Sequence, residues 1–127
     1  MIKVEIPMKF PSFNEYVNEC RSNKFAAAST KKQLERDIGY FINKLPKFEK
    51  PVRINFLWIE VNKKRDFDNI CYAKKFILDA LQKSGKLKND NRKWVTGFKD
   101  DFGYGEEYKV ILEIEEVETD AKSRNDD

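Results

Sequence analysis

The spacing of apolar residues along the chain predicts an alternation of short strands and helices. Runs in which every second residue is apolar, or which are rich in β-branched and aromatic residues, predict strands, and apolar residues three or four apart predict helices. We expect strands at residues 2–8, 51–62, 93–99 and 108–117. We expect helices at residues 11–22, 26–45 and 69–85. The resulting order, β-α-α-β-α-β-β, predicts an α+β domain in which a small mixed β-sheet carries flanking helices.

Local signals place several of the boundaries. Ser12, followed three residues later by Glu15, forms the capping-box pattern that starts a helix. Pro46 predicts the end of the second helix, because proline lacks the N–H that a helix needs. Gly85 predicts the C-terminal cap of the third helix.

The strand at 51–62 differs from the others because apolar residues fall on both of its faces. A strand of this kind is typical of the interior of a sheet, so we expect it to be central. The glycine-rich segment 100–107, DDFGYGEE, predicts a hairpin turn or a mobile loop between the last two strands.

The chain has 127 residues, which favours one folded domain. We expect this domain to span residues 1–117, and residues 118–127 to be a disordered acidic tail, because they have almost nothing to bury. The sequence contains neither a membrane-length apolar stretch nor a secretory signal, so we expect no membrane partner and a cytoplasmic location. Cys20 and Cys71 lack a CxxC spacing, which favours free thiols in a reducing compartment.

Charge is unevenly distributed along the chain. The whole chain carries +3, whereas the segment from Glu113 onward carries −5 from seven acidic and two basic residues, so residues 1–112 carry +8. This excess suits a polyanion such as a nucleic acid backbone, and a basic but merely well-solvated surface explains it equally well. The chain has no histidine, which excludes catalysis by an imidazole base and zinc sites of mixed Cys/His type.

Two carboxylates follow the apolar strand within a basic segment, KKRDFDN. Either Lys63, Lys64 and Arg65 balance the charge of Asp66 and Asp68, or the two carboxylates hold a cation. If the backbone stays extended here, both carboxylates project from one face with Cα atoms about 7 Å apart. The intervening residue, Phe67, would then point into the core. Carboxylate pairs of this kind bind hard cations such as Mg²⁺, and Asp90, in the loop after the third helix, is the best candidate for a third ligand.

A lysine on the third helix adds to this constellation. Lys75 follows Asp68 by seven residues, or about two helical turns, so a continuous helix places both on one face. There Lys75 could stabilise negative charge that develops on a phosphate. The alternative is an ordinary surface ion pair between Lys75 and Asp79.

The pattern RDFDN, followed by AKKFILDAL and KSGKLKNDN, resembles the RusA-like Holliday junction resolvases, and the resemblance extends over about residues 5–115. It implies that Asp66, Asp68 and Asp90 bind Mg²⁺, with Mn²⁺ as an alternative, and that these residues and Lys75 act in catalysis. The segment between RDFDN and DAL is about three residues longer than in the family's best-known members, so Lys74 competes with Lys75 for the lysine role. The family's DD pair reads Asn89-Asp90 here.

The resemblance implies a metal-dependent endodeoxyribonuclease that acts as a homodimer and resolves four-way junctions and related branched DNA by paired incisions. The alternative is a protein of the same fold that binds branched or duplex DNA without cutting it, and a third interpretation is a structural domain whose acids and bases pair at the surface. The expected DNA contacts are the basic residues around the carboxylates: Lys63, Lys64, Arg65, Lys74, Lys75, Arg92 and Lys93.

Overall fold

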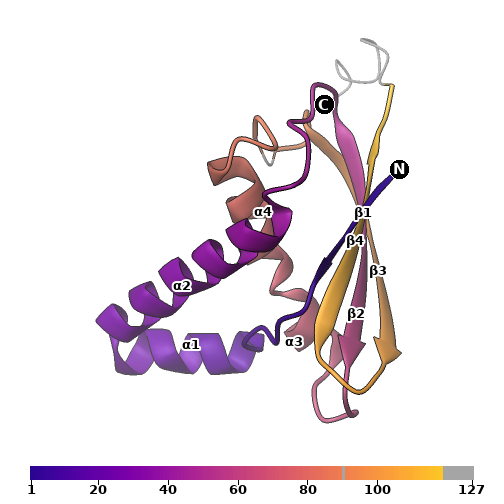
Figure 1. Cartoon of the computed structure of the whole chain (residues 1–127). Helices are drawn as coiled ribbons and strands as arrows, with labels where there is room; N and C mark the ends of the chain where they lie inside the picture. Colours follow the sequence, from indigo (N-terminus) through magenta and orange to yellow (C-terminus); the bar gives the residue numbers. More distant parts are fainter. Residues whose placement is uncertain (90, 119–127) are drawn as a thin grey trace.

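A computed structural model, which describes residues 1–89 and 91–118, gives the protein the predicted α+β architecture: a mixed four-stranded sheet with helices packed on one face (Figure 1). The strands are β1 (Ile2–Ile6), β2 (Val52–Glu60), β3 (Val95–Tyr104) and β4 (Lys109–Glu116). The helices are α1 (Phe13–Ser22), α2 (Lys24–Ile42), α3 (Phe67–Cys71) and α4 (Lys74–Lys83). Asp90 and the predicted tail beyond residue 118 lie outside the described residues.

The strand order is β1-β4-β2-β3, so β2 is an interior strand, as predicted. It pairs with β4 in the antiparallel sense and with β3 in the parallel sense. A parallel pair needs a crossover connection, and α3 and α4 provide it. The crossover brings the loop after β2 and the helix that follows it to the β3 edge of the sheet.

The predicted hairpin between the last two strands is wrong. β2 lies between β3 and β4, and β3 continues through residues 100–104, which the sequence placed in the turn. Aspartate and glycine are weak strand formers, but the ladder with β2 pairs Asp100 with Phe56 and Phe102 with Trp58 and so supplies backbone partners for this segment. Tertiary pairing thus overrides local propensity.

The hydrophobic core lies between the sheet and the helices. Alternate residues of β2 (Val52, Ile54, Phe56 and Trp58) are buried against the helices. Leu57 and Ile59 point to the opposite face and are only half-buried. The apolar character of both faces therefore predicted the interior position of β2 correctly, although helices cover only one face of the sheet in the described part of the chain (Figure 1).

The start of α1 has the predicted capping box. The Glu15 amide donates to the Ser12 hydroxyl at 3.2 Å, and the Glu15 carboxylate accepts from the Ser12 amide at 3.4 Å. α2 ends at Ile42, shortly before Pro46, and Gly85 takes a φ of 78° just after α4. No helix in the described residues has the length and apolar character needed to cross a membrane.

The helix predicted at 69–85 is interrupted. α3 ends at Cys71 and α4 begins at Lys74, and the amides of Ala73, Lys75 and Phe76 each donate to the carbonyl three residues earlier. The buried residues Ile70, Ala73 and Phe76 are spaced three apart, which suits a 3₁₀ turn, where side chains at i and i+3 eclipse. Asp68 and Lys75 therefore do not share one continuous helical face.

Candidate metal site and its basic surroundings

Asp66 and Asp68 lie at the start of α3. Asp66 is the N-cap, with φ −75° and ψ 155°, and the helix begins at Phe67, so that Asp68 belongs to its first turn. The condition for projecting both carboxylates from one face, an extended backbone through both residues, is therefore not met, because the chain becomes helical between them. Both side chains remain exposed. The two carboxylates thus lie at the N-terminal end of α3, directly after the loop that leaves β2.

Phe67 does not point into the core. It is 57% exposed and stacks on Phe102 of β3, with ring centroids 4.0 Å apart and planes inclined by 13°. The expected inward direction depended on a strand-like alternation of side chains, which the start of α3 removes. The residue between the two candidate ligands in the sequence therefore carries an exposed aromatic ring.

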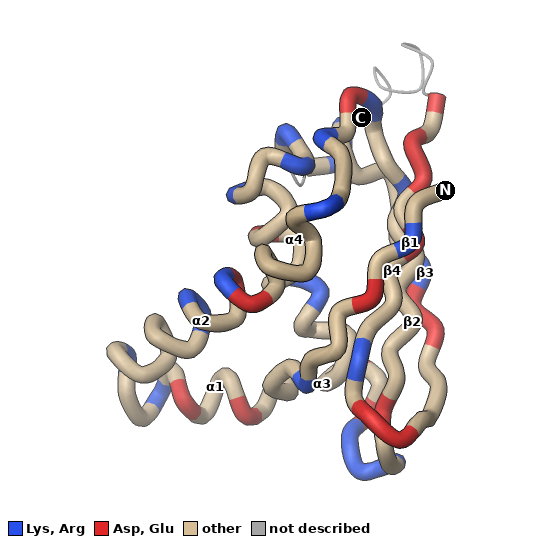
Figure 2. The backbone as a smooth tube through the Cα atoms, viewed as in Figure 1, with Lys and Arg blue, Asp and Glu red and all other residues tan. Residues whose placement is uncertain are grey.

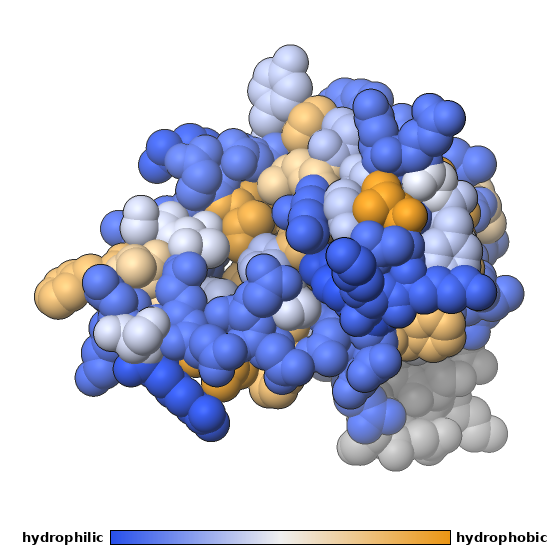
Figure 3. All heavy atoms as spheres, turned by 90° about the horizontal axis from the view of Figure 1, so that it is seen from below, coloured by the Kyte–Doolittle hydropathy of each residue, from blue (hydrophilic) through white to orange (hydrophobic). Residues whose placement is uncertain are grey.

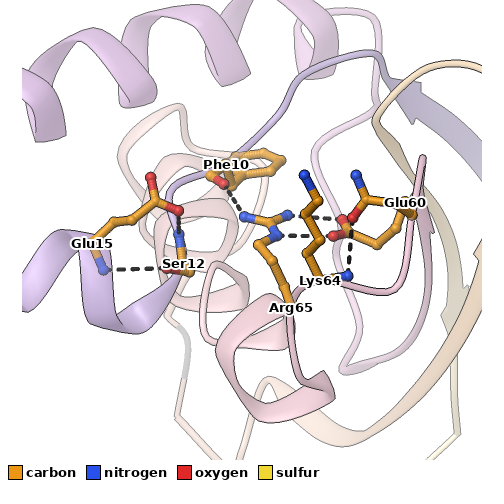
Figure 4. A network of polar contacts seen from close by, with 7 residues as sticks. Phe10, Ser12, Glu15, Glu60, Lys64 and Arg65 are labelled. Atoms are coloured by element: carbon orange, nitrogen blue, oxygen red, sulfur yellow. Dashed lines mark hydrogen bonds and ion pairs between the residues drawn. The ribbon is translucent and has the colours of Figure 1, made fainter.

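Arg65 is bound to the body of the protein (Figure 4). Its Nε and Nη2 donate to the two carboxylate oxygens of Glu60 at 2.8 Å each, and its Nη1 donates to the carbonyl oxygen of Phe10 at 2.7 Å. The hydrogen bonds to Glu60 raise the pKa of Arg65 above its ordinary value, against the opposing effect of burial. Arg65 thus anchors the loop, and a contact from its guanidinium to DNA, as the sequence predicted, receives no support from this arrangement.

The carboxylates of Asp66 and Asp68 differ from Arg65 in this respect. Within residues 1–89 and 91–118, neither side chain accepts a hydrogen bond or forms an ion pair. The ammonium of Lys63 lies 5.6 Å from the centre of the Tyr104 ring, and the backbone amide of Lys64 donates to Asn62. The basic residues before the motif therefore do not neutralise the two aspartates by direct contact. Figure 2 shows the basic loop after β2 at the lower end of the sheet.

Lys74 lies in a cluster that the sequence did not predict. Its ammonium is 2.6 Å from the carboxylate of Asp100 and lies over the rings of Phe98 and Phe56, at 4.7 and 5.4 Å. Asp100 also accepts a hydrogen bond from the indole N–H of Trp58 at 2.9 Å. Alternation along β3 could have placed Asp100 on the helix-facing side, had residues 100–104 been recognised as a strand.

Lys75 is exposed. Among the described residues, Asp79 pairs with Lys31 at 3.9 Å and not, as the sequence had suggested, with Lys75. The two candidate lysines are thus in different environments: Lys74 is held by Asp100, whereas Lys75 faces solvent. The segment between RDFDN and DAL contains the interruption between α3 and α4, so counting residues along one helix could not decide between the two lysines.

Cys71, at the end of α3, is adjacent to the same cluster. Burial raises the pKa of its thiol, the carboxylate of Asp100 raises it further, and the ammonium of Lys74 lowers it. The pKa of the Cys71 thiol therefore depends on the charges of Lys74 and Asp100.

The predicted third ligand, Asp90, lies outside the described residues. In the described part of the chain, no three acidic or cysteine side chains gather closely enough to hold a metal ion. Asp66 and Asp68 offer carboxylate oxygens, which are the ligands that Mg²⁺ prefers, and their exposure leaves room for a further ligand and for water. Lys93 is exposed in the loop before β3.

No protein-family model matches the chain, and no curated protein matches its sequence significantly. The resemblance to the RusA-like resolvases thus depends on the motif residues themselves.

Proposed function

We propose that this chain is a Mg²⁺-dependent endodeoxyribonuclease that cuts four-way junctions and related branched DNA. One observation carries the proposal: two exposed carboxylates, unpaired within the described residues, lie at the start of α3 directly after a basic loop, and the arginine of that loop pairs with Glu60. Leaving two neighbouring carboxylates unneutralised has a Coulombic cost that a bound cation would remove. The motif resemblance supports the same function.

In this proposal Asp66, Asp68 and Asp90 would hold the metal ion. When bound, Mg²⁺ supplies activation of a water molecule and stabilisation of the phosphate undergoing attack. Arg65 acts as a positioning residue, because its bonds to Glu60 and Phe10 fix the loop that carries Asp66. Lys75 is available for a phosphate contact because its side chain faces solvent.

Two further features of the proposal concern the DNA. The +8 charge of residues 1–112 supports attraction to the phosphate backbone, with Lys63 and Lys64 as exposed contacts beside the carboxylates. A four-way junction has two-fold character, so we propose that a homodimer makes the paired incisions.

An incision assay on a synthetic four-way junction and its matching duplex tests the proposal. We expect wild-type protein to make Mg²⁺-dependent paired nicks near the crossover, and we expect EDTA and Asp66→Asn each to abolish them. Asp101→Asn is the matched control, because Asp101 lies on the sheet face opposite the helices, in register with Leu57. Incision by Asp66→Asn at the wild-type rate would refute the site.

The same charge excess favours a second candidate, a protein that binds branched or duplex DNA without cutting it. Tight junction binding without incision under any divalent metal ion would support this candidate. Phosphate binding of this kind weakens with salt and has no requirement for Mg²⁺.

A further inference from the structure

Exposed aromatic side chains lie directly beside the candidate metal site. Phe67 lies between Asp66 and Asp68 in the sequence, and Phe102 covers one face of its ring at a centroid distance of 4.0 Å. More than half of the Phe67 side chain remains open to solvent, so the uncovered face of the ring is accessible. Figure 3 shows the molecule from below, where isolated apolar side chains interrupt a largely hydrophilic surface.

The ring of Phe67 is supported by Phe102, on which it stacks. Phe102 is only partly buried, but it packs against the hydrophobic core and is paired with Trp58 in the β2–β3 ladder. Pairing of β3 with β2 at this point holds the backbone that carries Phe102, and packing against the core restricts where its ring can lie. The stack therefore offers a flat apolar surface that is supported by the sheet.

Further residues extend this surface along the edge strand. Tyr104 lies two residues beyond Phe102, hence on the same sheet face, and is 55% exposed. Lys63 approaches its ring to 5.6 Å, and Lys64 is exposed nearby in the chain. Flat rings beside lysines fit a ligand that combines aromatic faces with negative charge.

Among ligands of that chemistry, single-stranded nucleic acid fits best. Each of its bases presents a π-face that can stack on an aromatic side chain, and its phosphates suit the adjacent lysines. A base inside a continuous duplex has both faces occupied by its neighbours, so it cannot stack on Phe67 without first leaving the duplex. The surface therefore selects for nucleotides that are already unpaired.

We propose that Phe67, supported by Phe102, stacks on an unpaired base of the DNA held at the Asp66–Asp68 site. This inference rests on the proposed function only in requiring that DNA binds at this surface, and it does not require cleavage. It identifies DNA with unpaired nucleotides at a branch point, such as a fork, as the preferred class of substrate over continuous duplex.

Binding measurements on two DNAs test the inference. Fluorescence anisotropy in EDTA, where a metal-dependent nuclease makes no incision, would compare a forked duplex that has unpaired arms with a continuous duplex of the same length. We expect Phe67→Ala and Phe67→Leu to weaken fork binding by about tenfold to a hundredfold, the loss expected for one base–aromatic stack. We expect duplex binding to change by less than about twofold, and Phe67→Tyr, which keeps the ring, to bind the fork like wild type.

Phe25→Ala is the matched control, because Phe25 is 89% exposed at the start of α2 and is remote in the sequence from the aspartates. It should bind both DNAs like wild type. The inference fails if Phe67→Ala leaves fork binding unchanged, weakens fork and duplex binding equally, or is matched by Phe25→Ala.

The outcomes also separate this inference from nuclease activity. Fork binding that depends on the Phe67 ring, without incision in Mg²⁺, would support the stacking role and refute the nuclease. If the protein makes incisions but its fork binding is unchanged by Phe67→Ala, only the stacking role is refuted. A protein that binds neither DNA would refute both.

Discussion

Arg65 and Glu60 form a bidentate ion pair at the point where β2 passes into the loop that carries Asp66. Both N–H···O distances are 2.8 Å, and the side chains are only 14% and 7% exposed. The third bond of Arg65, to the carbonyl of Phe10, reaches across 55 residues of sequence to the segment before α1. A single side chain thus links the N-terminal segment, the central strand and the loop.

Removing Arg65 should destabilise the protein. We expect Arg65→Gln to lower the free energy of unfolding by about 3 kcal/mol, because it leaves the buried Glu60 carboxylate without its partner. The double variant Arg65→Met, Glu60→Leu should lose less than the single variant, since it leaves no unpaired charge. Urea unfolding measures both. Arg53→Gln, at an exposed position of β2, is the control and should change stability by less than about 0.5 kcal/mol. If Arg65→Gln lowers the free energy of unfolding by less than this control does, the ion pair between Arg65 and Glu60 does not stabilise the protein.

The ion pair between Lys74 and Asp100 should be measurable by a double-mutant cycle. We expect Lys74→Met and Asp100→Asn each to destabilise the protein by about 1–2 kcal/mol, with a coupling energy of about 1 kcal/mol, because the pair is mostly buried and 2.6 Å long. Lys75→Met is the matched control at the next position, where the side chain is exposed, and should have almost no effect on unfolding. Equal losses of unfolding free energy for the two lysine variants would show that the ion pair between Lys74 and Asp100 does not stabilise the protein.

Cys71 should be alkylated slowly, because burial and the Asp100 carboxylate raise the pKa of its thiol and the thiolate is the reactive form. In a Cys20→Ser background, the pH dependence of iodoacetamide labelling should have its midpoint above that of a free cysteine. Asp100→Asn should move the midpoint down, and Lys74→Met, which removes a cation that lowers the pKa, should move it up. Labelling in urea gives the unfolded reference, and a folded midpoint below that reference would contradict the arrangement.

Mg²⁺ should stabilise the folded chain if Asp66 and Asp68 bind it. At a concentration ten times its Kd, we expect Mg²⁺ to add about 1.4 kcal/mol to the free energy of unfolding. Asp66→Asn should remove this gain, and without metal it should leave stability equal or slightly higher, since it relieves repulsion between neighbouring carboxylates. Thermal unfolding with and without Mg²⁺ measures the effect, with Asp101→Asn as the charge-matched control. An equal Mg²⁺ response of Asp66→Asn and wild type would place the metal elsewhere.

The sequence by itself determined the features that depend on neighbouring residues. The alternation in β1 and β4, the capping box of Ser12 and Glu15, and the interior position of β2 all follow from apolar spacing and local hydrogen bonding. The exposed carboxylates at 66 and 68 also follow from the sequence, because charged side chains after an apolar strand remain in solvent unless partners bury them.

Only the tertiary structure decided the features that depend on residues far apart in the chain. Asp100 contacts Lys74 and Trp58 across 26 and 42 positions, and those contacts exist because β3 pairs with β2 rather than β4. The stacking of Phe67 on Phe102 has the same origin. A local pattern reports which residues are apolar or charged, whereas strand pairing decides which of them meet, because it is the summed result of packing and hydrogen bonds over the whole sheet.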